Sequence, residues 1–484
     1  MMQVLSVAAE AYPLVKTGGL GDVVGALPGA LADHGVTVTT LLPGYPAVRD
    51  HIGAAPFVHH YENLFGVEAR ILASQLNGHP LLVLDAPALF LRNGNIYTDR
   101  KGADWPDNWR RFAALGRAAA DLASGAISNW HFDILHAHDW HAGLAPAYLR
   151  YAPGPGPIAP SAITIHNIAF QGRFDVSVFP FLGLPPAAYH IDGIEYYGGI
   201  GFLKAGLASA NAITTVSPGY AKEIQSAAFG MGLEGLIQTR EKDVFGILNG
   251  IDPQIWNPVT DAALAARYDA HSLKARQANK RAIEAGFELT PGDGPLFAVV
   301  SRLSWQKGMD VLVDAIDTLV TLGGRLALLG TGDAALEEKF RAAAARHPGK
   351  VAMALGYDES LSHLLQGGAD AILIPSRFEP CGLTQLYGLA YGCVPLAART
   401  GGLRDTIIDA NEAALAQGAA TGILFDGMTK DAIVQALQRT VALYARPEIW
   451  AGLQIQGMQA DFSWRRSGAR YAELYRQLAG AKPA

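Results

Sequence analysis

Short apolar runs alternate along the first half of the chain with stretches of helical period. Val4–Ala8, Ile134–Ala137 and Ala162–Ile165 are almost uninterrupted apolar segments, and the first precedes a glycine-rich turn and an apolar helical stretch, Val23 to Leu31. A strand with one face in water alternates apolar and polar residues, whereas a strand covered on both faces is continuously apolar. The pattern therefore predicts parallel strands between helices, which is an α/β fold.

The second half repeats this pattern. Leu296–Val300 predicts a strand, and the apolar positions after it follow the spacing of one helix face: Met309, Leu312, Val313, Ile316, Leu319 and Val320. Further strands are predicted at Arg325–Leu329, Val351–Leu355 and Ala371–Ile374, and a solvated helix around residues 338–346.

A chain of 484 residues exceeds the ~250–300 residues at which single cores stop growing, so two domains are expected. A turn-rich segment at residues 246–253 predicts the boundary. We expect an N-terminal Rossmann-like domain at 1–245, a C-terminal one at 246–460 and an amphipathic helix within 461–484. Ligands of such sheets bind outside the carboxyl ends of the strands, so a cleft between the domains is the expected site.

Composition narrows the possible functions. The net charge of −6 argues against a protein held on nucleic acid by bulk electrostatics. Only two cysteines are present, Cys381 and Cys393, which excludes a disulfide scaffold. The first apolar run has no basic residue before it and ends at Glu10, so it predicts a buried strand rather than a signal peptide. No run reaches the ~18 apolar residues of a membrane span, and we expect a cytoplasmic protein.

Two segments carry cations directly after predicted strands. Lys16-Thr17-Gly18-Gly19-Leu20-Gly21-Asp22 precedes a helix, where glycine amides and the helix dipole favour an anion. It lacks the Walker and dinucleotide-binding spacings, and an ordinary tight turn stays possible. Arg302 and Lys307 follow the strand at 296–300, where two cations would clamp a diphosphate. Two solvated loop cations are the alternative.

A third segment, Ser376 to Thr384, follows the strand at 371–374. Pro380 suits the first turn of a helix, so the N–H groups of residues 381–384 are expected to point outward. Glu379 would then accept hydrogen bonds from sugar hydroxyls, although an acid that stabilises a helix start explains it equally well.

The segment His136-Ala137-His138-Asp139-Trp140-His141 is rich in possible metal ligands, but it lacks the usual zinc spacing. We favour a polar rim in which Trp140 offers a stacking face to a sugar ring. A satisfied polar turn is the alternative. His166, after the strand at 162–165, and Tyr97, in a polar and aromatic loop, are weaker candidates.

Taken together, these segments resemble the bacterial glycogen synthase and plant starch synthase family from Gln3 to about Tyr475. The matching motifs are Lys16-Thr17-Gly18-Gly19-Leu20, His138-Asp139-Trp140-His141-Ala142-Gly143, Thr164-Ile165-His166-Asn167, Leu248-Asn249-Gly250-Ile251-Asp252, Ser301-Arg302-Leu303 with Gln306-Lys307-Gly308, and Glu379-Pro380-Cys381-Gly382-Leu383-Thr384-Gln385. Their number and order make the resemblance specific.

The resemblance implies a GT-B glycosyltransferase with two Rossmann-like domains facing across a deep cleft, and a C-terminal helix that crosses back to the first domain. It implies transfer of glucose from ADP-glucose to the non-reducing end of an α-1,4-glucan such as glycogen or a maltooligosaccharide. The anomeric configuration would be retained, without metal, cofactor, nucleic acid or membrane.

The resemblance also implies roles for individual residues. Catalytic roles fall on Lys16, His166, Arg302, Lys307 and Glu379. Nucleotide-sugar contacts fall on Gly18, Gly19, Asp22, Asn249, Tyr357, Cys381, Gly382, Leu383 and Thr384, with Tyr357 stacked on adenine. Contacts to glucose or acceptor fall on Tyr97, Asp139 and Trp140.

One position departs from the broader retaining-glycosyltransferase pattern. That pattern has a second glutamate eight positions after the first, where this chain has Tyr387. A ribose contact by a second carboxylate is therefore in doubt. The alternatives to a synthase are a UDP-sugar transferase, a phosphorylase with a pyridoxal-phosphate lysine, a non-catalytic glucan-binding protein, and a metallohydrolase using His136, His138 and His141.

Overall fold

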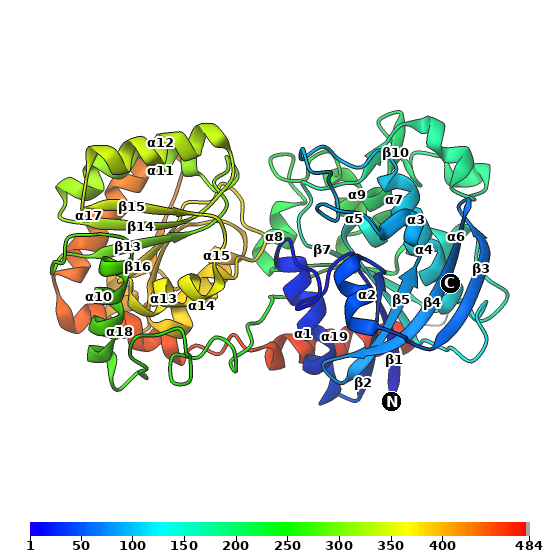
Figure 1. Ribbon diagram of the computed structural model, residues 1–484, viewed down its shortest axis with the longest axis horizontal. Helices are drawn as coiled ribbons and strands as arrows, with labels where there is room; N and C mark the ends of the chain where they lie inside the picture. The colour runs from blue at the N-terminus through cyan, green and yellow to red at the C-terminus, as the bar shows by residue number, and fades with distance from the viewer. Residues whose placement is uncertain (481–484) are drawn as a thin grey trace. The chain divides into compact units, whose positions relative to one another are not determined.

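The computed structural model describes residues 1–480 and forms two compact units. The N-terminal unit comprises Met1–Gly250 together with the segment from Trp464, and the C-terminal unit comprises Ile251–Ser463. Residues 481–484, the end of the expected C-terminal segment, lie outside the described residues. Each unit is an α/β domain with its own core (Figure 1).

The N-terminal unit is built on a sheet of strand order β12-β11-β7-β6-β1-β2-β5-β4-β3. Its strands are β1 (Met2–Val7), β2 (Val36–Pro43), β3 (Phe57–Leu64), β4 (Val67–Leu76), β5 (His79–Asp85), β6 (Ile134–His138), β7 (Ser161–Ile165), β11 (Ala212–Thr215) and β12 (Val244–Gly246). A small separate sheet contains β8 (Arg173–Phe174), β9 (Glu195–Tyr196) and β10 (Gly199–Gly201).

The predicted strands at 4–8, 134–137 and 162–165 are confirmed as β1, β6 and β7, which pair in parallel and are buried almost throughout. The pairing is parallel from β12 to β5, whereas β3 and β4 are antiparallel additions at one edge. The sequence interpretation missed these two strands because they are half exposed and carry polar residues, so they lack a continuous apolar run.

Helices cover this sheet. They are α1 (Gly19–Ala32), α2 (Pro46–Ile52), α3 (Pro87–Phe90), α4 (Asn108–Ala123), α5 (Asp139–Ala142), α6 (Leu144–Tyr151), α7 (Phe202–Ser209), α8 (Pro218–Glu223), α9 (Glu234–Thr239) and α19 (Trp464–Gly480). The C-terminal helix α19 packs in this unit against α1 and buries Tyr471 and Tyr475 beside the start of β1.

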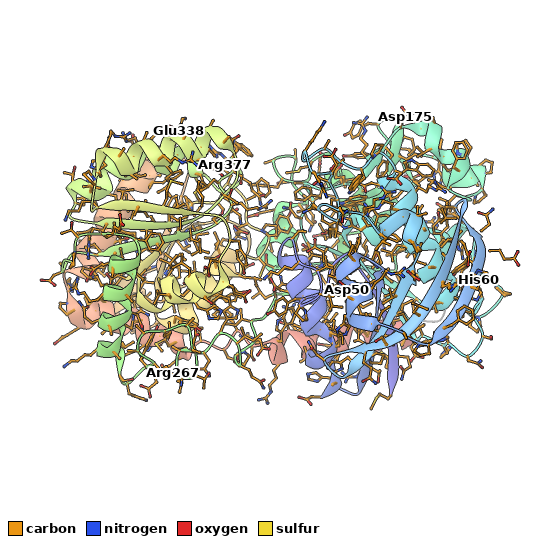
Figure 2. All side chains as sticks on the ribbon, in the orientation of Figure 1. Asp50, His60, Asp175, Arg267, Glu338 and Arg377 are labelled. Atoms are coloured by element: carbon orange, nitrogen blue, oxygen red, sulfur yellow. The ribbon has the colours of Figure 1, made fainter. Side chains whose placement is uncertain are left out.

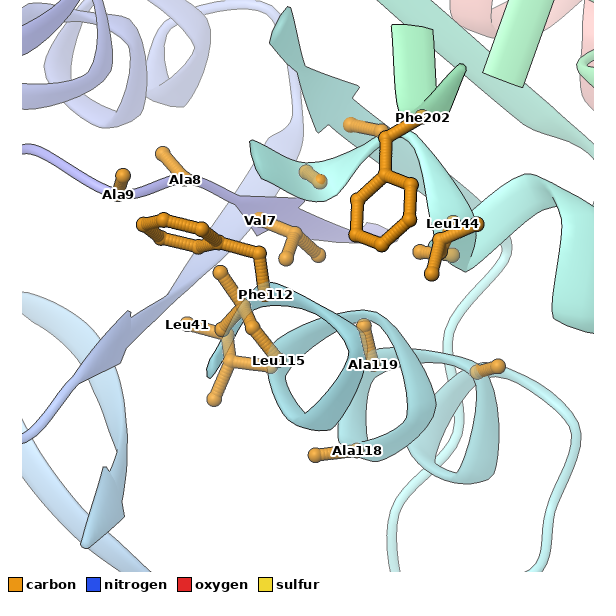
Figure 3. Close-up of a cluster of buried hydrophobic side chains, with 14 of the residues drawn as sticks. Val7, Ala8, Ala9, Leu41, Phe112, Leu115, Ala118, Ala119, Leu144 and Phe202 are labelled. Atoms are coloured by element: carbon orange, nitrogen blue, oxygen red, sulfur yellow. The ribbon is translucent and has the colours of Figure 1, made fainter. Parts of the chain in front are cut away.

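Figure 3 shows the core between β1 and helix α4. Small side chains on α4, including Ala118 and Ala119, are fully buried and let the helix approach closely, while Phe112 lies under Ala8 and Ala9 at the end of β1. This packing fixes the position of the residues that follow β1.

The C-terminal unit has a parallel sheet of order β15-β14-β13-β16-β17-β18. Its strands are β13 (Leu296–Val300), β14 (Arg325–Gly330), β15 (Val351–Leu355), β16 (Ala371–Ile374), β17 (Val394–Ala398) and β18 (Ile423–Phe425). Its helices are α10 (Arg276–Gly286), α11 (Met309–Thr321), α12 (Ala334–Arg346), α13 (Glu359–Gly368), α14 (Thr384–Tyr391), α15 (Gly401–Thr406), α16 (Glu412–Ala416), α17 (Lys430–Tyr444) and α18 (Pro447–Gln459).

This second sheet is covered on both faces, with α11, α12 and α17 on one side and α10, α13 and α14 on the other (Figure 1). The strands and helices predicted for the second half are confirmed to within a few residues. Polar side chains such as Asp50, His60, Asp175, Arg267 and Glu338 project from the surfaces of their units (Figure 2). No helix in residues 1–480 is long and apolar enough to cross a membrane.

Candidate active site

In the N-terminal unit the candidate residues follow the carboxyl ends of neighbouring strands. Lys16 comes after β1, Asp139 after β6 and His166 after β7, and these strands are adjacent in the sheet in the order β7-β6-β1. The turns after parallel strands meet at one edge of a sheet, which is where open α/β sheets bind ligands. The topology therefore gathers residues that are up to 150 positions apart in the sequence.

The glycine turn after β1 leads directly into α1, which begins at Gly19 with Gly18 as its N-cap. Lys16 is about one-third exposed, and its Nζ lies 2.7 Å from Asp22 Oδ1 on the first turn of that helix. Two of the backbone amides of this turn already have a partner within the protein. Oε2 of the buried Glu10 accepts the N–H groups of Thr17 and Gly18, at 2.6 and 3.3 Å.

Tyr97 lies next to this turn. Its hydroxyl donates to Glu10, and its ring stacks on His141 with 4.6 Å between ring centroids. Burial, followed by the charge of Glu10, holds the pKa of Tyr97 well above its usual value, so the phenol keeps its proton.

Asp139 begins the short helix α5 with φ of 55°, a left-handed conformation that Asp tolerates better than most residues. This backbone aims the carboxyl group at the next strand, where Oδ1 accepts the N–H of His166 at 2.7 Å. Burial raises the pKa of Asp139 to about 8, against the lowering effect of the N–H groups of His166 and Asn167. The hydrogen bond to Asp139 therefore fixes the backbone of His166.

Three buried histidines, His136, His138 and His166, lie against one another. His138 Nδ1 lies 3.0 Å from His166 Nε2, and His136 is bonded through both ring nitrogens to Tyr475 and Thr164. Burial lowers the pKa of His136 and of His166 to about 3, so both rings are neutral near pH 7. Within residues 1–480 no group of His, Cys, Asp or Glu side chains is arranged to hold a metal ion.

The prediction that Trp140 forms an exposed stacking face is wrong. Its side chain is buried against Phe112, Phe174 and Phe202 and against the backbone of Gly172. Helix α5 directs the indole ring of Trp140 into the core. The turn after β6 is therefore part of the core rather than a polar rim.

Asn249, near the end of the N-terminal unit, is buried, and its Oδ1 has no hydrogen-bond partner within the described residues. Buried polar atoms in native proteins nearly always have partners, so such an exception needs an explanation. Its position after β12 is on the same side of the sheet as the other turns.

In the C-terminal unit, the loop after β13 packs on the loop after β16. Gly308 has a φ of +68°, and a Cβ there would lie 1.8 Å from the carbonyl oxygen of Pro375, so only glycine fits. The backbone N–H of Arg377 donates to Gln306, and the Arg377 guanidinium binds Asp310 with two hydrogen bonds. These contacts fix the Lys307 loop.

The result is a direct ion pair between two predicted site residues. Lys307 Nζ donates to Glu379 Oε2, and Ser376 Oγ donates to the same oxygen at 2.8 Å. Both side chains are largely buried, and Glu379 Oε1 accepts no hydrogen bond from the described residues. A small cavity of about 40 Å³ beside them is also lined by Gly382, Leu383 and Thr384.

The helix after Glu379 begins later than predicted. Pro380 is not in its first turn, since α14 starts at Thr384 with Leu383 as N-cap. Gly382 adopts φ of +71° and Gln385 Nε2 bonds the carbonyls of Cys381 and Gly382, so this segment is a loop. Cys381 is buried, whereas Gly382, Leu383 and Thr384 are partly exposed.

Comparison with known proteins identifies the family. Residues 3–239 match the family model described as "Starch synthase catalytic domain", and residues 281–451 match "Glycosyl transferases group 1". A glycogen synthase of Novosphingobium aromaticivorans is 60% identical over 478 residues, which are 99% of each chain. Glycogen synthase 1 of Rhizobium meliloti is 57% identical over the same share of each chain. This chain belongs to the glycogen synthase family.

Among solved structures, the catalytic domain of starch synthase IV from Arabidopsis thaliana, bound to ADP and acarbose, has a TM-score of 0.88 and 31% identity. The match covers 99% of this chain and 100% of that one. The fold is therefore the GT-B type of the glycogen and starch synthases, and the chain is a glycosyltransferase of that family.

The structure shows the surroundings of two further positions singled out above, Tyr357 and Tyr387. Tyr357 follows β15 on an exposed loop, and its side chain is 68% exposed, so its ring is accessible to a ligand. Tyr387 stacks on Trp256 with ring centroids 3.5 Å apart, and Trp256 stacks on His363. The position of the missing second glutamate is thus occupied by aromatic packing.

The sequence interpretation missed Glu10 and Ser376. In the sequence, Glu10 stands only as the end of an apolar run, and Ser376 only as the start of a motif. The available signal for Glu10 was an acidic residue directly after a buried strand and before a glycine turn, which is an expensive place for a carboxylate without partners.

We predict that the thiol of Cys381 has no role in the glycogen synthase reaction. The expected contact to a sugar is through the backbone amide, because the side chain is buried and lies outside the cavity beside Lys307. Cys381→Ser is therefore expected to keep kcat within about threefold of wild type. A loss above 100-fold in a folded variant would show that the thiol itself takes part.

Proposed function

We propose that this protein transfers glucose from ADP-glucose to the non-reducing end of an α-1,4-glucan, with retention of anomeric configuration and without metal or cofactor. The observation that carries the proposal is the arrangement of Lys307, Glu379 and the start of α14 around one cavity. A cation, a carboxylate and helix N–H groups together suit a ligand with both a phosphate and sugar hydroxyls. The ADP bound to the Arabidopsis relative supports the choice of nucleotide.

The chemistry needs positive charge on the leaving group. As the bond from the anomeric carbon to the diphosphate oxygen breaks, negative charge develops on the phosphate and positive charge on the sugar. Lys307 and the exposed Arg302, both after β13, are proposed to bind the diphosphate, and Lys16 is proposed to contact it from the N-terminal unit. These cations supply the charge that a metal ion would otherwise supply.

Glu379 is proposed to bind glucose hydroxyls through Oε1, while Oε2 stays with Lys307 and Ser376. His166 is neutral, so its ring is suited to a hydrogen bond with the sugar and not to charge stabilisation. We propose front-face attack. The acceptor 4-hydroxyl oxygen bonds to the anomeric carbon on the side that the diphosphate leaves, and its proton passes to the departing phosphate oxygen.

Stereochemistry and mechanism are tested with radiolabelled ADP-glucose, maltohexaose and a metal chelator. Chain extension by α-linked glucose, unchanged by chelator, is expected, with the anomeric proton of the first product followed by NMR. A β-linked product or a covalent glucosyl-enzyme, detected by mass spectrometry after rapid quenching, would contradict the proposed mechanism.

We predict that Tyr357 contributes to donor binding by stacking on adenine. Stacking of an aromatic side chain on a base is worth about 1–3 kcal/mol, so Tyr357→Ala is expected to raise the KM for ADP-glucose about tenfold, with kcat nearly unchanged. Tyr357→Phe keeps the ring and is the matched control. An unchanged KM in the alanine variant would remove Tyr357 from the base site.

A further inference from the structure

A buried carboxylate lies beneath the glycine turn. Glu10 is 3% exposed and follows β1, whose end is fixed by the packing of Ala8 and Ala9 on Phe112 (Figure 3). Burying a carboxylate is costly unless it is well hydrogen-bonded, so its partners indicate what it is for.

The two oxygens of Glu10 bind different segments. Oε2 accepts the backbone N–H groups of Thr17 and Gly18, which fixes the backbone directly before helix α1. Oε1 accepts the hydroxyls of Tyr97 and Thr17, the latter at 2.5 Å. One carboxylate therefore joins the turn that carries Lys16 to a loop 80 residues further along the chain.

Local contacts of the turn include the Tyr12 N–H to the Gly21 carbonyl and the pair of Lys16 with Asp22, but the helix start has no side-chain cap. Gly18, the N-cap of α1, has no side chain that could bond the first N–H groups of the helix. Gly21 packs closely here, since a Cβ at this position would lie 3.4 Å from Glu10 Oε2 and 3.1 Å from the Val15 carbonyl. Glu10, seven and eight residues away, instead fixes the two residues directly before the helix, Thr17 and Gly18.

Lys16 stays outside this arrangement. Its ammonium group pairs with Asp22 and its side chain is about one-third exposed, whereas the contacts of Glu10 are to the neighbouring backbone and hydroxyls. The hydrogen bonds of Glu10 therefore hold the turn in place, while the Lys16 side chain stays accessible to a ligand.

We propose that Glu10 is a positioning residue for the transfer reaction, which acts by holding the Lys16 turn and the phenol of Tyr97 in one fixed arrangement. The inference rests on the proposed function of Lys16 as a diphosphate contact. It assigns Glu10 no contact with either substrate.

The test is a double-mutant cycle of Glu10→Ala and Lys16→Ala, with kcat/KM for ADP-glucose as readout. If Glu10 acts through the position of Lys16, removing Lys16 should cost about 100-fold in the wild-type background but less than about fivefold in the Glu10→Ala background. Glu62→Ala, an exposed glutamate of the same unit, is the matched control, and its combination with Lys16→Ala should be additive.

Glu10→Gln provides a second variant if the alanine protein does not fold. The amide oxygen can still accept from the turn backbone, and the amide group can donate to the hydroxyl oxygens, which are able to turn round. We expect Glu10→Gln to keep most of the Lys16 effect, more than about 20-fold. Thermal unfolding of each variant separates lost activity from lost fold.

The outcomes separate the possible failures. Additive effects of Glu10→Ala and Lys16→Ala in folded proteins would overturn the positioning role while the function stands. Loss of the Lys16 effect in the Glu10→Gln protein would likewise overturn it. A wild-type protein that does not turn over ADP-glucose would instead refute the proposed function.

Discussion

Lys307→Ala is expected to lower kcat/KM for ADP-glucose by up to about 100-fold, mainly through kcat. A hydrogen bond to a charged group is worth about 1.5–3 kcal/mol, and each 1.36 kcal/mol is tenfold in rate. The effect falls on kcat because charge on the diphosphate grows toward the transition state. The same change also leaves the buried Glu379 without its cation, which disturbs the proposed glucose contact.

Steady-state kinetics of the variant, with maltohexaose or glycogen as acceptor, measure this effect. Lys339→Ala, at an exposed position of α12 in the same unit, is the matched control and should resemble wild type. Because loss of a buried ion pair also costs stability, an unfolding curve accompanies the kinetics. A folded Lys307→Ala protein within threefold of wild-type kcat would remove Lys307 from the reaction.

Lys16→Ala is expected to cost about 100-fold in kcat/KM while changing the free energy of unfolding by less than about 1 kcal/mol. The small stability effect is expected because Lys16 and Asp22 form a partly exposed pair, with exposed fractions of 30% and 22%. The loss of activity in Lys16→Ala should therefore come with a smaller loss of stability than in Lys307→Ala.

The matched control for this change is Lys101→Ala, an exposed lysine in a loop of the same unit. Calorimetric titration with ADP alone adds a readout that does not depend on turnover, and we expect weaker binding by the Lys16 variant. Near-normal turnover and ADP binding would show that the glycine turn only connects β1 to α1.

Most of the fold follows from patterns that depend on burial. The strands around Val4, Ile134 and Leu296 are covered on both faces, so their continuous apolar runs identify them. The edge strand β3 and its neighbour β4 face water in part and have no such run. The start of α14 was predicted too early because Pro380 suits a helix start, whereas the left-handed backbone of Gly382 keeps the segment a loop.

The site could be predicted only as a set of motifs. Short sequence segments reveal Lys307 and Glu379, but not that they pair, since this depends on β13 and β16 being neighbours. Trp140 and Glu10 show that a short motif does not reveal whether a side chain is buried or which residues it contacts. A tryptophan in a polar motif proved to be core, and a glutamate at the end of a strand proved to organise the glycine turn.

The use of ADP-glucose by this member of the glycogen synthase family can be tested by nucleoside diphosphate release with glycogen. Release is measured for ADP-glucose and UDP-glucose at equal concentration, with and without chelator. We expect strong preference for ADP-glucose and no effect of chelator. Preference for UDP-glucose would contradict the assignment of adenine as the base. No diphosphate release from either donor, in a protein that still binds glucan, would contradict the proposed transferase activity.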